Sequence, residues 1–168
     1  MQFVKGSSSE LIGYTDSDHA GDMEKRKSTS GAVFFLGNNI VTWSSQKQKV
    51  VSLSSCESEY IAAALAACQG VWLSRLLADV THSGVKKFRL MIDNKSAEEL
   101  SRNPVFHERS KHIDTRYHYI REAVAEGVVD LQHVCTDDQL ADILTKPLPR
   151  IRFAEMRRQL GMVKVDHD

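Results

Sequence analysis

The chain has 168 residues, 42% of them hydrophobic, which suits one compact domain with a core of its own. Lysine plus arginine equals aspartate plus glutamate at 22 each, so the molecule has no net charge to attract a polyanion, and any affinity for nucleic acid must be local. Its three cysteines, Cys56, Cys68 and Cys135, are odd in number and far apart, which excludes a disulfide framework and a zinc site of the Cys-x-x-Cys type.

Three strands are predicted at the start of the domain. Alternating apolar and polar residues predict a first strand over residues 10–17, and residues 31–37 and 40–46 are predicted as the second and third strands. Asn38 and Asn39 suit a tight hairpin between the second and third strands, because asparagine tolerates positive φ. We expect the three strands to be antiparallel.

A change of apolar spacing marks the longest predicted helix, over residues 55–79. Residues 87–93 have the composition of a buried strand, and the long crossover helix before this strand makes it parallel to its neighbour. A short helix follows, with Ser96 as its expected cap and Glu99 three residues later.

The remaining elements complete an α/β domain. They are a helix over 112–126, a strand over 128–134, a helix over 137–145 that Thr136 and Gln139 open as a capping box, and a basic helix over 150–160 after Pro147 and Pro149. This order predicts a five-stranded mixed sheet, three antiparallel strands and then parallel ones, with helices on both faces. The domain is assigned to residues 10–160, with a tail or linker at 1–9 and a tail at 161–168.

Targeting signals are not expected in this sequence. The start of the chain has no apolar signal core, and the longest apolar run, residues 60–68, is far short of a membrane span. We therefore expect an intracellular protein in a reducing compartment, with no membrane partner.

Four acidic residues fall where the predicted fold would bring them together. Asp16 lies on the first strand, and Asp93 ends the strand expected to run beside it, about 4.8 Å away. Glu59 comes from the first turns of the long helix, and Asp142 comes from the helix after the last strand. Grouped carboxylates without matching bases are costly unless a metal binds, and oxygen ligands suit Mg²⁺. Two such ions about 3.5–4 Å apart can activate a water against a phosphodiester, so the pattern indicates a nuclease.

Six segments, in order along nearly the whole chain, carry a resemblance to a known family. They are Gly13-Tyr14-Thr15-Asp16-Ser17-Asp18, Lys27-Ser28-Thr29-Ser30-Gly31, Ser54-Ser55-Cys56-Glu57-Ser58-Glu59-Tyr60, Asp93-Asn94-Lys95-Ser96-Ala97, Lys111-His112-Ile113-Asp114 and Leu140-Ala141-Asp142-Ile143-Leu144-Thr145-Lys146. Together they resemble the ribonuclease H domain at the end of copia-type (LTR) retrotransposon polyproteins.

The resemblance implies the ribonuclease H-like fold, in agreement with the predicted order of strands and helices. It also implies that the catalytic and metal-binding acids, holding two Mg²⁺ ions that Mn²⁺ can replace, are Asp16, Glu59, Asp93 and Asp142. The implied activity is hydrolysis of the RNA strand of RNA–DNA hybrids, which leaves 3′-hydroxyl and 5′-phosphate ends. The implied partners are the hybrid and the reverse transcriptase domain of the same polyprotein, in cytoplasmic virus-like particles or in the nucleus.

Neighbouring acids compete with the predicted metal ligands. If Ser54 caps the long helix, Glu57 can reach back to that cap, while Glu59, two residues on, points to nearly the opposite side. We therefore predict a structural role for Glu57 and metal binding for Glu59. Asp18 and Asp22 are expected to be turn residues of a solvated loop.

Small polar groups and a cation are predicted to contact the substrate. Ser54 and Ser55 match the family position that holds a phosphate or sugar hydroxyl, and plain N-capping explains them equally well. Lys27, Ser28 and Thr29 either touch the nucleic-acid backbone or keep a hairpin end soluble.

Histidines and tryptophans receive structural interpretations. His133 lies within a predicted strand, and His112 lies at a helix start where it can pair with Asp114, so neither is assigned a catalytic role. Trp43 and Trp72 fall at apolar-periodic positions and are expected in the core.

Two alternatives stand beside the nuclease. One is a catalytically weak or inactive domain that binds hybrid or packs on a reverse transcriptase, which predicts hybrid binding without magnesium-dependent cleavage. The other is a recombinase or integrase of the same fold, which would act on DNA. Cleavage assays on hybrid and on duplex DNA distinguish the three.

Overall fold

The computed structural model of the chain describes residues 9–102, 113 and 115–162. It contains one mixed five-stranded sheet in the order β3-β2-β1-β4-β5. The strands are β1 (Leu11–Ser17), β2 (Thr29–Leu36), β3 (Asn39–Lys47), β4 (Phe88–Ile92) and β5 (Val129–His133). Antiparallel pairing joins β1, β2 and β3, and parallel pairing joins β1, β4 and β5, so the predicted sheet is confirmed.

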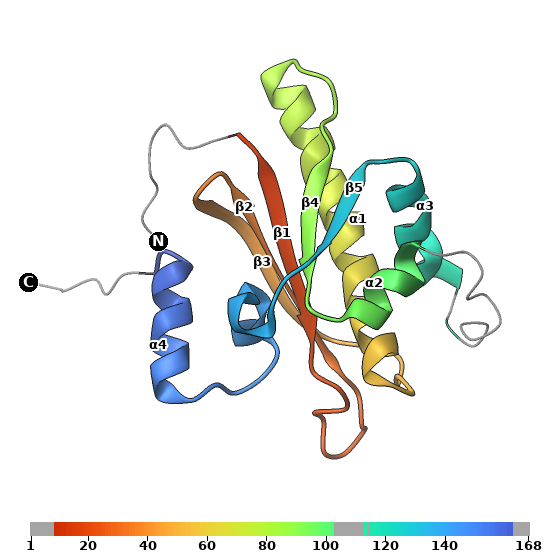
Figure 1. Cartoon of the computed structure of the whole chain (residues 1–168), viewed down its shortest axis with the longest axis vertical. Coiled ribbons are helices and arrows are strands. Elements are labelled where there is room, and N and C mark those ends of the chain that lie inside the picture. The colour runs from red at the N-terminus through yellow and green to blue at the C-terminus, as the bar shows by residue number, and fades with distance from the viewer. Residues whose placement is uncertain (1–8, 103–112, 114, 163–168) are drawn as a thin grey trace, which may run out of the picture.

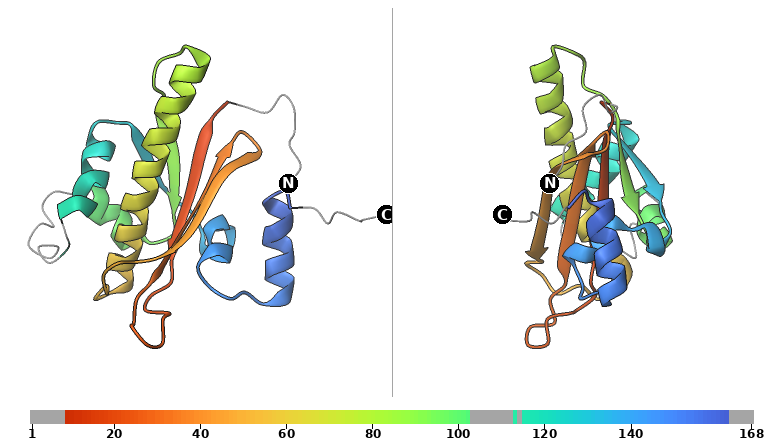
Figure 2. Two further views of the ribbon diagram at one scale, coloured as in Figure 1. Left: turned by 180° about the vertical axis from the view of Figure 1, so that it is seen from behind. Right: turned by 90° about the vertical axis from the view of Figure 1, so that its left-hand side faces the viewer.

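Helical segments cover both faces of this sheet (Figures 1 and 2). They are α1 (Ser55–Thr81), α2 (Lys95–Arg102), the 3₁₀ turn η2 (Thr115–His118), α3 (Tyr119–Ala125), the 3₁₀ turns η3 (Thr136–Asp138) and η4 (Leu140–Leu144), and α4 (Arg150–Gln159). The first three α-helices lie on one face, and η4 and α4 lie on the other. The predicted arrangement of helices on both faces is therefore confirmed.

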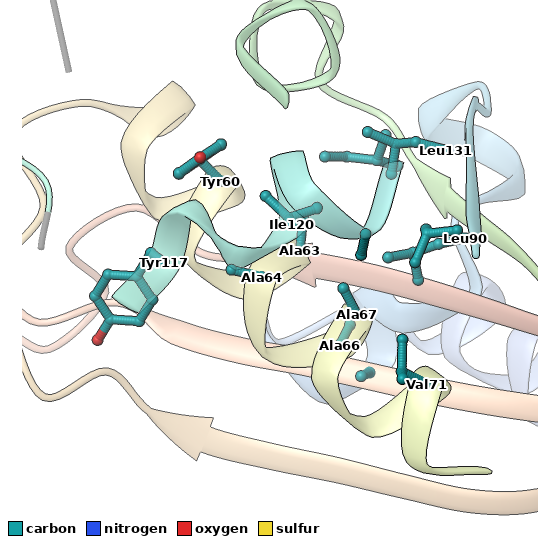
Figure 3. Close-up of a cluster of buried hydrophobic side chains, with 14 of the residues drawn as sticks. Tyr60, Ala63, Ala64, Ala66, Ala67, Val71, Leu90, Tyr117, Ile120 and Leu131 are labelled. Carbon is teal, nitrogen blue, oxygen red and sulfur yellow. The ribbon is translucent and has the colours of Figure 1, made fainter. Parts of the chain in front are cut away.

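The main core lies between α1 and the sheet (Figure 3). The inner side of α1 is built largely from small residues such as Ala63 and Ala67, both fully buried. At Gly70 a Cβ atom would lie only 2.2 Å from the Phe88 ring of β4, so the helix needs glycine there to approach the strand. A second, smaller cluster on the other face joins β2 and β3 to η4 and to the end of α4.

The α1 helix is long and apolar enough to cross a membrane by length and composition alone. However, 61% of its apolar window is buried inside the domain, against the sheet, as in the core helix of a globular protein. The high alanine content of α1 is therefore explained by packing on the strands.

Two local predictions differ from the structure at turns and caps. The β2–β3 turn consists of Gly37 and Asn38, and Gly37 has the positive φ, 60°, that we had expected of an asparagine. Glycine adopts this φ without steric cost, which explains the shift of the turn by one residue. The cap of α2 is Asn94, whose Oδ1 accepts a hydrogen bond from Ala97 N at 3.0 Å, and the prediction of Ser96 is wrong.

Both tryptophans are exposed, which corrects their assignment to the core. Trp43 is 51% exposed on the edge strand β3, and Trp72 is 56% exposed on α1. Large apolar residues occur on both sides of α1, since Leu65 and Leu76 are exposed as well. The apolar period of this helix therefore does not identify its buried face, which its alanines form in large part.

Parts of three predictions fall outside the described residues. These are most of the two expected tails and the start of the helix expected at residue 112, including His112. The described remainder of that helix is η2 followed by α3.

Candidate active site

The parallel pairing of β1 and β4 brings the first two predicted acids together. In the observed register Tyr14 lies opposite Met91. Two residues further along each strand, the same register places Asp16 level with Asp93, at the carboxyl ends of both strands. Asp16 is almost completely buried, and Asp93 is half-buried.

Glu59 joins these two acids from the second turn of α1. Its Oε1 accepts a hydrogen bond from the backbone N–H of Ser17 at 3.1 Å, which holds the side chain against the end of β1. Carboxylate oxygens of Asp16, Glu59 and Asp93 all lie within 4.8 Å of one another. Among the described residues, this three-residue group is therefore a candidate metal site.

Asp142 comes from η4, where an α-helix over 137–145 was predicted. The expected capping box of Thr136 and Gln139 is also wrong, because the fully buried Gln139 bonds differently. Its side-chain amide donates to the carbonyl of Thr15 at 2.9 Å, and its Oε1 accepts from Ala141 N at 3.2 Å. These two bonds tie the start of η4 to β1 beside Asp16, so tertiary contacts replace the regular helix.

Gly31 on β2 allows η4 to come this close. It lies opposite Asp16 in the β1–β2 register. A Cβ atom at Gly31 would lie 2.7 Å from Thr145 Cγ2 and 2.9 Å from Leu144 Cβ. The end of η4 therefore packs directly on the backbone of β2.

Thr145 and Lys146 connect Asp142 to the other acids. The Thr145 hydroxyl hydrogen bonds to Oδ2 of Asp16. The Lys146 ammonium lies 2.8 Å from Asp142 Oδ1 and 3.8 Å from Asp16 Oδ2. Although burial alone would lower the pKa of Lys146, the pairing with Asp142 and Asp16 raises it above its usual value.

Burial and mutual repulsion disfavour ionisation of the clustered acids. Burial, followed by the charges of Asp16 and Asp93, raises the pKa of Glu59 to about 9. Burial also raises the pKa of Asp16 to about 6, against the opposing effects of Thr145 and Lys146. Near neutral pH the metal-free cluster therefore holds at least one proton that a cation could replace.

The donor set fits a hard divalent cation. Glu59 Oε2 is buried and has no hydrogen-bond partner among the described residues, although its environment is polar. Buried oxygens without a partner are costly, and a cation at the centre of the carboxylates would satisfy them. The converging ligands are all carboxylate oxygens. Mg²⁺ and Mn²⁺ prefer oxygen ligands, whereas softer metals prefer sulfur and nitrogen ligands.

No family model matches the chain, but its sequence is similar to part of retrotransposon polyproteins. It is 42% identical over 165 residues to the retrovirus-related Pol polyprotein from transposon RE2 of Arabidopsis thaliana, covering 96% of this chain and 11% of that protein. It is 41% identical over 158 residues to the Pol polyprotein from transposon TNT 1-94 of Nicotiana tabacum, covering 94% of this chain and 12% of that protein. The chain thus spans a small part of the length of these relatives.

Solved structures give the fold. The N-terminal RNase H domain of rv2228c from Mycobacterium tuberculosis, solved as a fusion with maltose-binding protein, has a TM-score of 0.55 at 14% identity, covering 90% of this chain and 98% of that chain. The RNase H1 of Halobacterium salinarum has a TM-score of 0.50 at 17% identity, covering 81% and 94%. This chain has a ribonuclease H-like fold and is homologous to a segment of retrotransposon Pol polyproteins.

At the start of α1, Glu57 has the structural environment predicted for it, with one difference. Ser54 caps α1, because its Oγ accepts from Glu57 N at 3.1 Å. The Glu57 carboxylate accepts from Leu53 N at 2.7 Å, one residue before the cap. Glu57 therefore closes the start of α1 and stays outside the carboxylate cluster.

Asp18 and Asp22 organise the loop between β1 and β2 and are turn residues, as predicted. Asp18 accepts a hydrogen bond from Thr29 N across the neck of the loop. Asp22 accepts from Glu24 N at 3.1 Å and pairs with Lys47 at 2.6 Å. The bond with Lys47, followed by the backbone bonds, lowers the pKa of Asp22 to about 2.

The five predicted substrate contacts have different surroundings. Ser54 and Ser55 are exposed at the start of α1, and Ser54 Oγ already serves as the cap. Ser28 is fully buried, and its hydroxyl accepts a hydrogen bond from Ala20 N and shares another with the hydroxyl of Ser52. Its side chain therefore faces the interior. The Lys27 ammonium donates to the backbone carbonyl of Lys49 at 2.8 Å. Thr29 is half-buried at the start of β2.

Several residues around the site were not assigned from sequence. Gln139, Gly31, Thr145 and Lys146 all position or contact the acids. Three of them fall within the motif segments, which is the one signal that could have indicated them, whereas nothing in the sequence shows which atoms they contact. His133 belongs to β5, as predicted, but it is the last residue of the strand and its side chain is exposed.

Proposed function

We propose that this chain is a ribonuclease H domain, a divalent-metal-dependent endonuclease that hydrolyses the RNA strand of RNA–DNA hybrids. The observation that carries the proposal is the convergence of Asp16, Glu59 and Asp93 within 4.8 Å, at the carboxyl ends of two parallel strands. Asp142 is the proposed fourth acid, because it lies beside Asp16 and shares Lys146 with it.

The residues of the domain would hold the ions and fix the orientation of their ligands. Asp16, Glu59, Asp93 and Asp142 are the proposed Mg²⁺ ligands, with Mn²⁺ as a substitute. Divalent ions held by such carboxylates lower the pKa of a bound water and stabilise charge on a phosphate. The Thr145 hydroxyl fixes the orientation of the Asp16 carboxylate through a hydrogen bond. Hydrogen bonds that orient a metal ligand in this way raise the affinity of a site for its metal.

The proposed substrate is recognised by exposed polar groups near the acids. Ser54 and Ser55 stand at the start of α1, the helix that supplies Glu59. A groove of about 250 Å³ between β3 and α1 begins beside Gly31 and is lined in part by Ser44 and Gln46. Hydroxyl and amide groups can hydrogen bond to 2′-hydroxyls, which distinguish RNA from DNA. Ser28 is not included among the proposed contacts, because it is buried.

Substitution of Asp93 by asparagine tests the proposal. We expect Asp93→Asn to reduce Mg²⁺-dependent cleavage of a labelled hybrid by more than about 100-fold, because a direct ligand matters at least as much as a supporting hydrogen bond. The half-buried position of Asp93 should let the variant fold, which circular dichroism and the melting temperature check.

The matched control is Asp130→Asn, on the next strand of the sheet but paired with Lys87 at 3.3 Å. It should retain cleavage. A wild-type domain that binds hybrid but does not cut it with Mg²⁺ or Mn²⁺ would favour the inactive-domain alternative, and cleavage of duplex DNA instead of hybrid would favour the recombinase alternative.

The homologous Pol polyproteins support one further part of the proposal. We propose that the domain acts beside the reverse transcriptase of the same polyprotein, in the cytoplasm within virus-like particles or in the nucleus. Co-purification of this domain with that polymerase segment, expressed as separate chains, would test the association.

A further inference from the structure

A lysine lies among the clustered acids. Among the ion pairs of the described residues, those that involve the four acids are both made by Lys146, at 2.8 Å from Asp142 and 3.8 Å from Asp16. Like charges brought together in a partly buried site repel strongly, and a single ammonium between two of them relieves part of that repulsion. The metal-free domain therefore contains its own counterion.

The backbone of Lys146 is fixed, whereas its side chain can leave. Its N–H donates to the carbonyl of Asp142 at 3.2 Å, and the preceding Thr145 is bonded to Asp16 through its hydroxyl. Pro147 follows and restricts the chain on the other side. The side chain itself is 36% exposed, so its flexible stem can carry the ammonium into solvent.

We propose that Lys146 is an internal counterion that competes with divalent ions for the carboxylates of Asp142 and Asp16. The inference rests on the proposed metal-dependent function. In the metal-free domain the ammonium stabilises the clustered acids. When divalent ions bind the acids, the ammonium is displaced, because the same oxygens cannot serve both cations fully. Lys146 therefore lowers the affinity for divalent ions and reduces the instability of the metal-free state.

Calorimetric titration with Mn²⁺ tests the competition directly. Lys146→Met keeps most of the length of the side chain and removes its charge. We expect it to bind Mn²⁺ about threefold to tenfold more tightly than the wild type, because no ammonium has to be displaced. The matched control is Lys87→Met, which removes a lysine paired with Asp130 at 3.3 Å and should bind Mn²⁺ as the wild type does.

Thermal unfolding supplies a readout that a purely structural lysine would not produce. In EDTA, Lys146→Met should melt about 2–4 °C below the wild type, since it loses the internal counterion. In saturating Mn²⁺ this difference should vanish or change sign. An equal loss of melting temperature in both conditions would overturn the inference.

Labelling of the wild-type domain avoids dependence on the variant's folding. An amine-reactive reagent, followed by peptide mass spectrometry, should modify Lys146 faster in Mg²⁺ than in EDTA, while modification of Lys87 stays constant. Unchanged Lys146 labelling, in a domain that the calorimeter shows to bind Mg²⁺, would reject the competition. If the wild type binds neither Mn²⁺ nor Mg²⁺, the proposed function itself fails. If the wild type binds and Lys146→Met binds equally well, only the inference about Lys146 fails.

Discussion

Glu57 and Glu59 lie two residues apart in α1, and their surroundings are opposite in kind. The Glu57 carboxylate satisfies the backbone N–H of Leu53 at the start of the helix. Glu59 points toward Ser17 and the other acids, because two residues turn an α-helix by roughly 200°. One acid therefore closes the helix start, and the other belongs to the carboxylate cluster.

The raised pKa values of Glu59 and Asp16 predict how pH affects the metal-free domain. Both acids bind protons in the folded state more tightly than their ordinary pKa values of 4.5 and 3.8 imply, since their folded pKa values are about 9 and about 6. The stability that this proton binding contributes is fully present below the ordinary pKa values and is lost as pH rises through the folded pKa values. Urea unfolding in EDTA should therefore show falling stability between about pH 5 and 9.

The variant Glu59→Gln, which cannot ionise, should lose much of this pH dependence and exceed the wild type in stability near pH 9. Glu57→Gln is the control: it should lose stability at the helix start and keep the wild-type dependence on pH. If the stability of the wild type and of Glu59→Gln changed with pH in the same way, the assignment of the buried proton to Glu59 would be contradicted.

At the scale of the elements, η4 determines whether the fourth acid joins the site. Gln139 ties its start to the carbonyl of Thr15, and Gly31 gives its end room on β2. The face of the sheet that carries η4 has only a small hydrophobic cluster. Specific polar and steric contacts therefore place this segment, together with the packing of Leu140, Ile143 and Leu144 on that cluster.

Substitution of Gly31 by alanine should displace η4. The new methyl group would lie 2.7 Å from Thr145 Cγ2 and 3.1 Å from the Ala141 carbonyl, so the segment must shift. We expect a loss of about 1–3 kcal/mol in the free energy of unfolding. We also expect weaker Mn²⁺ binding in calorimetry, because Thr145 moves away from Asp16. Gly84→Ala is the control, since a Cβ there meets nothing within 4 Å, and a Gly31→Ala domain with unchanged metal affinity would show that η4 tolerates the methyl group.

At the scale of the whole molecule, charge is balanced overall but distributed unevenly. The net charge is zero, so binding to a polyanion depends on local cations. Lys25 and Arg26 are exposed in the β1–β2 loop, which leaves β1 at the same end as the acids. Lys86 and Lys87 are exposed before β4, at the opposite end of that strand from Asp93.

This distribution predicts the salt dependence of hybrid binding. The double variant Lys25→Ala and Arg26→Ala should reduce the slope of log K against log salt by about 1–2, since each lost phosphate contact removes about 0.9. The measurement is fluorescence anisotropy with a labelled hybrid in an Asp93→Asn background, which prevents cleavage. The control double variant, Lys86→Ala with Lys87→Ala, should leave the slope unchanged. An equal effect of the two double variants would contradict binding of the hybrid at the end of the sheet that carries Lys25 and Arg26.

The sequence by itself determined the order of strands and helices, the parallel pairing of β1 and β4, and the cap of α1 by Ser54. It also selected Asp16, Glu59 and Asp93, which the structure brings together. The elements and the cap follow from apolar spacing and from residues close together in the chain, whereas the strand pairing and the acids follow from the expected strand order and from the family resemblance of the motif segments.

Only the tertiary structure decided the rest. It made η4 a 3₁₀ turn, exposed Trp43 and Trp72, buried Ser28 and placed Lys146 between two acids. Each of these outcomes depends on what a distant segment does: whether another element covers a side chain, or whether a partner such as Thr15 satisfies a polar group. Local periodicity carries no information about such partners, because burial and hydrogen bonding are properties of the assembled layers.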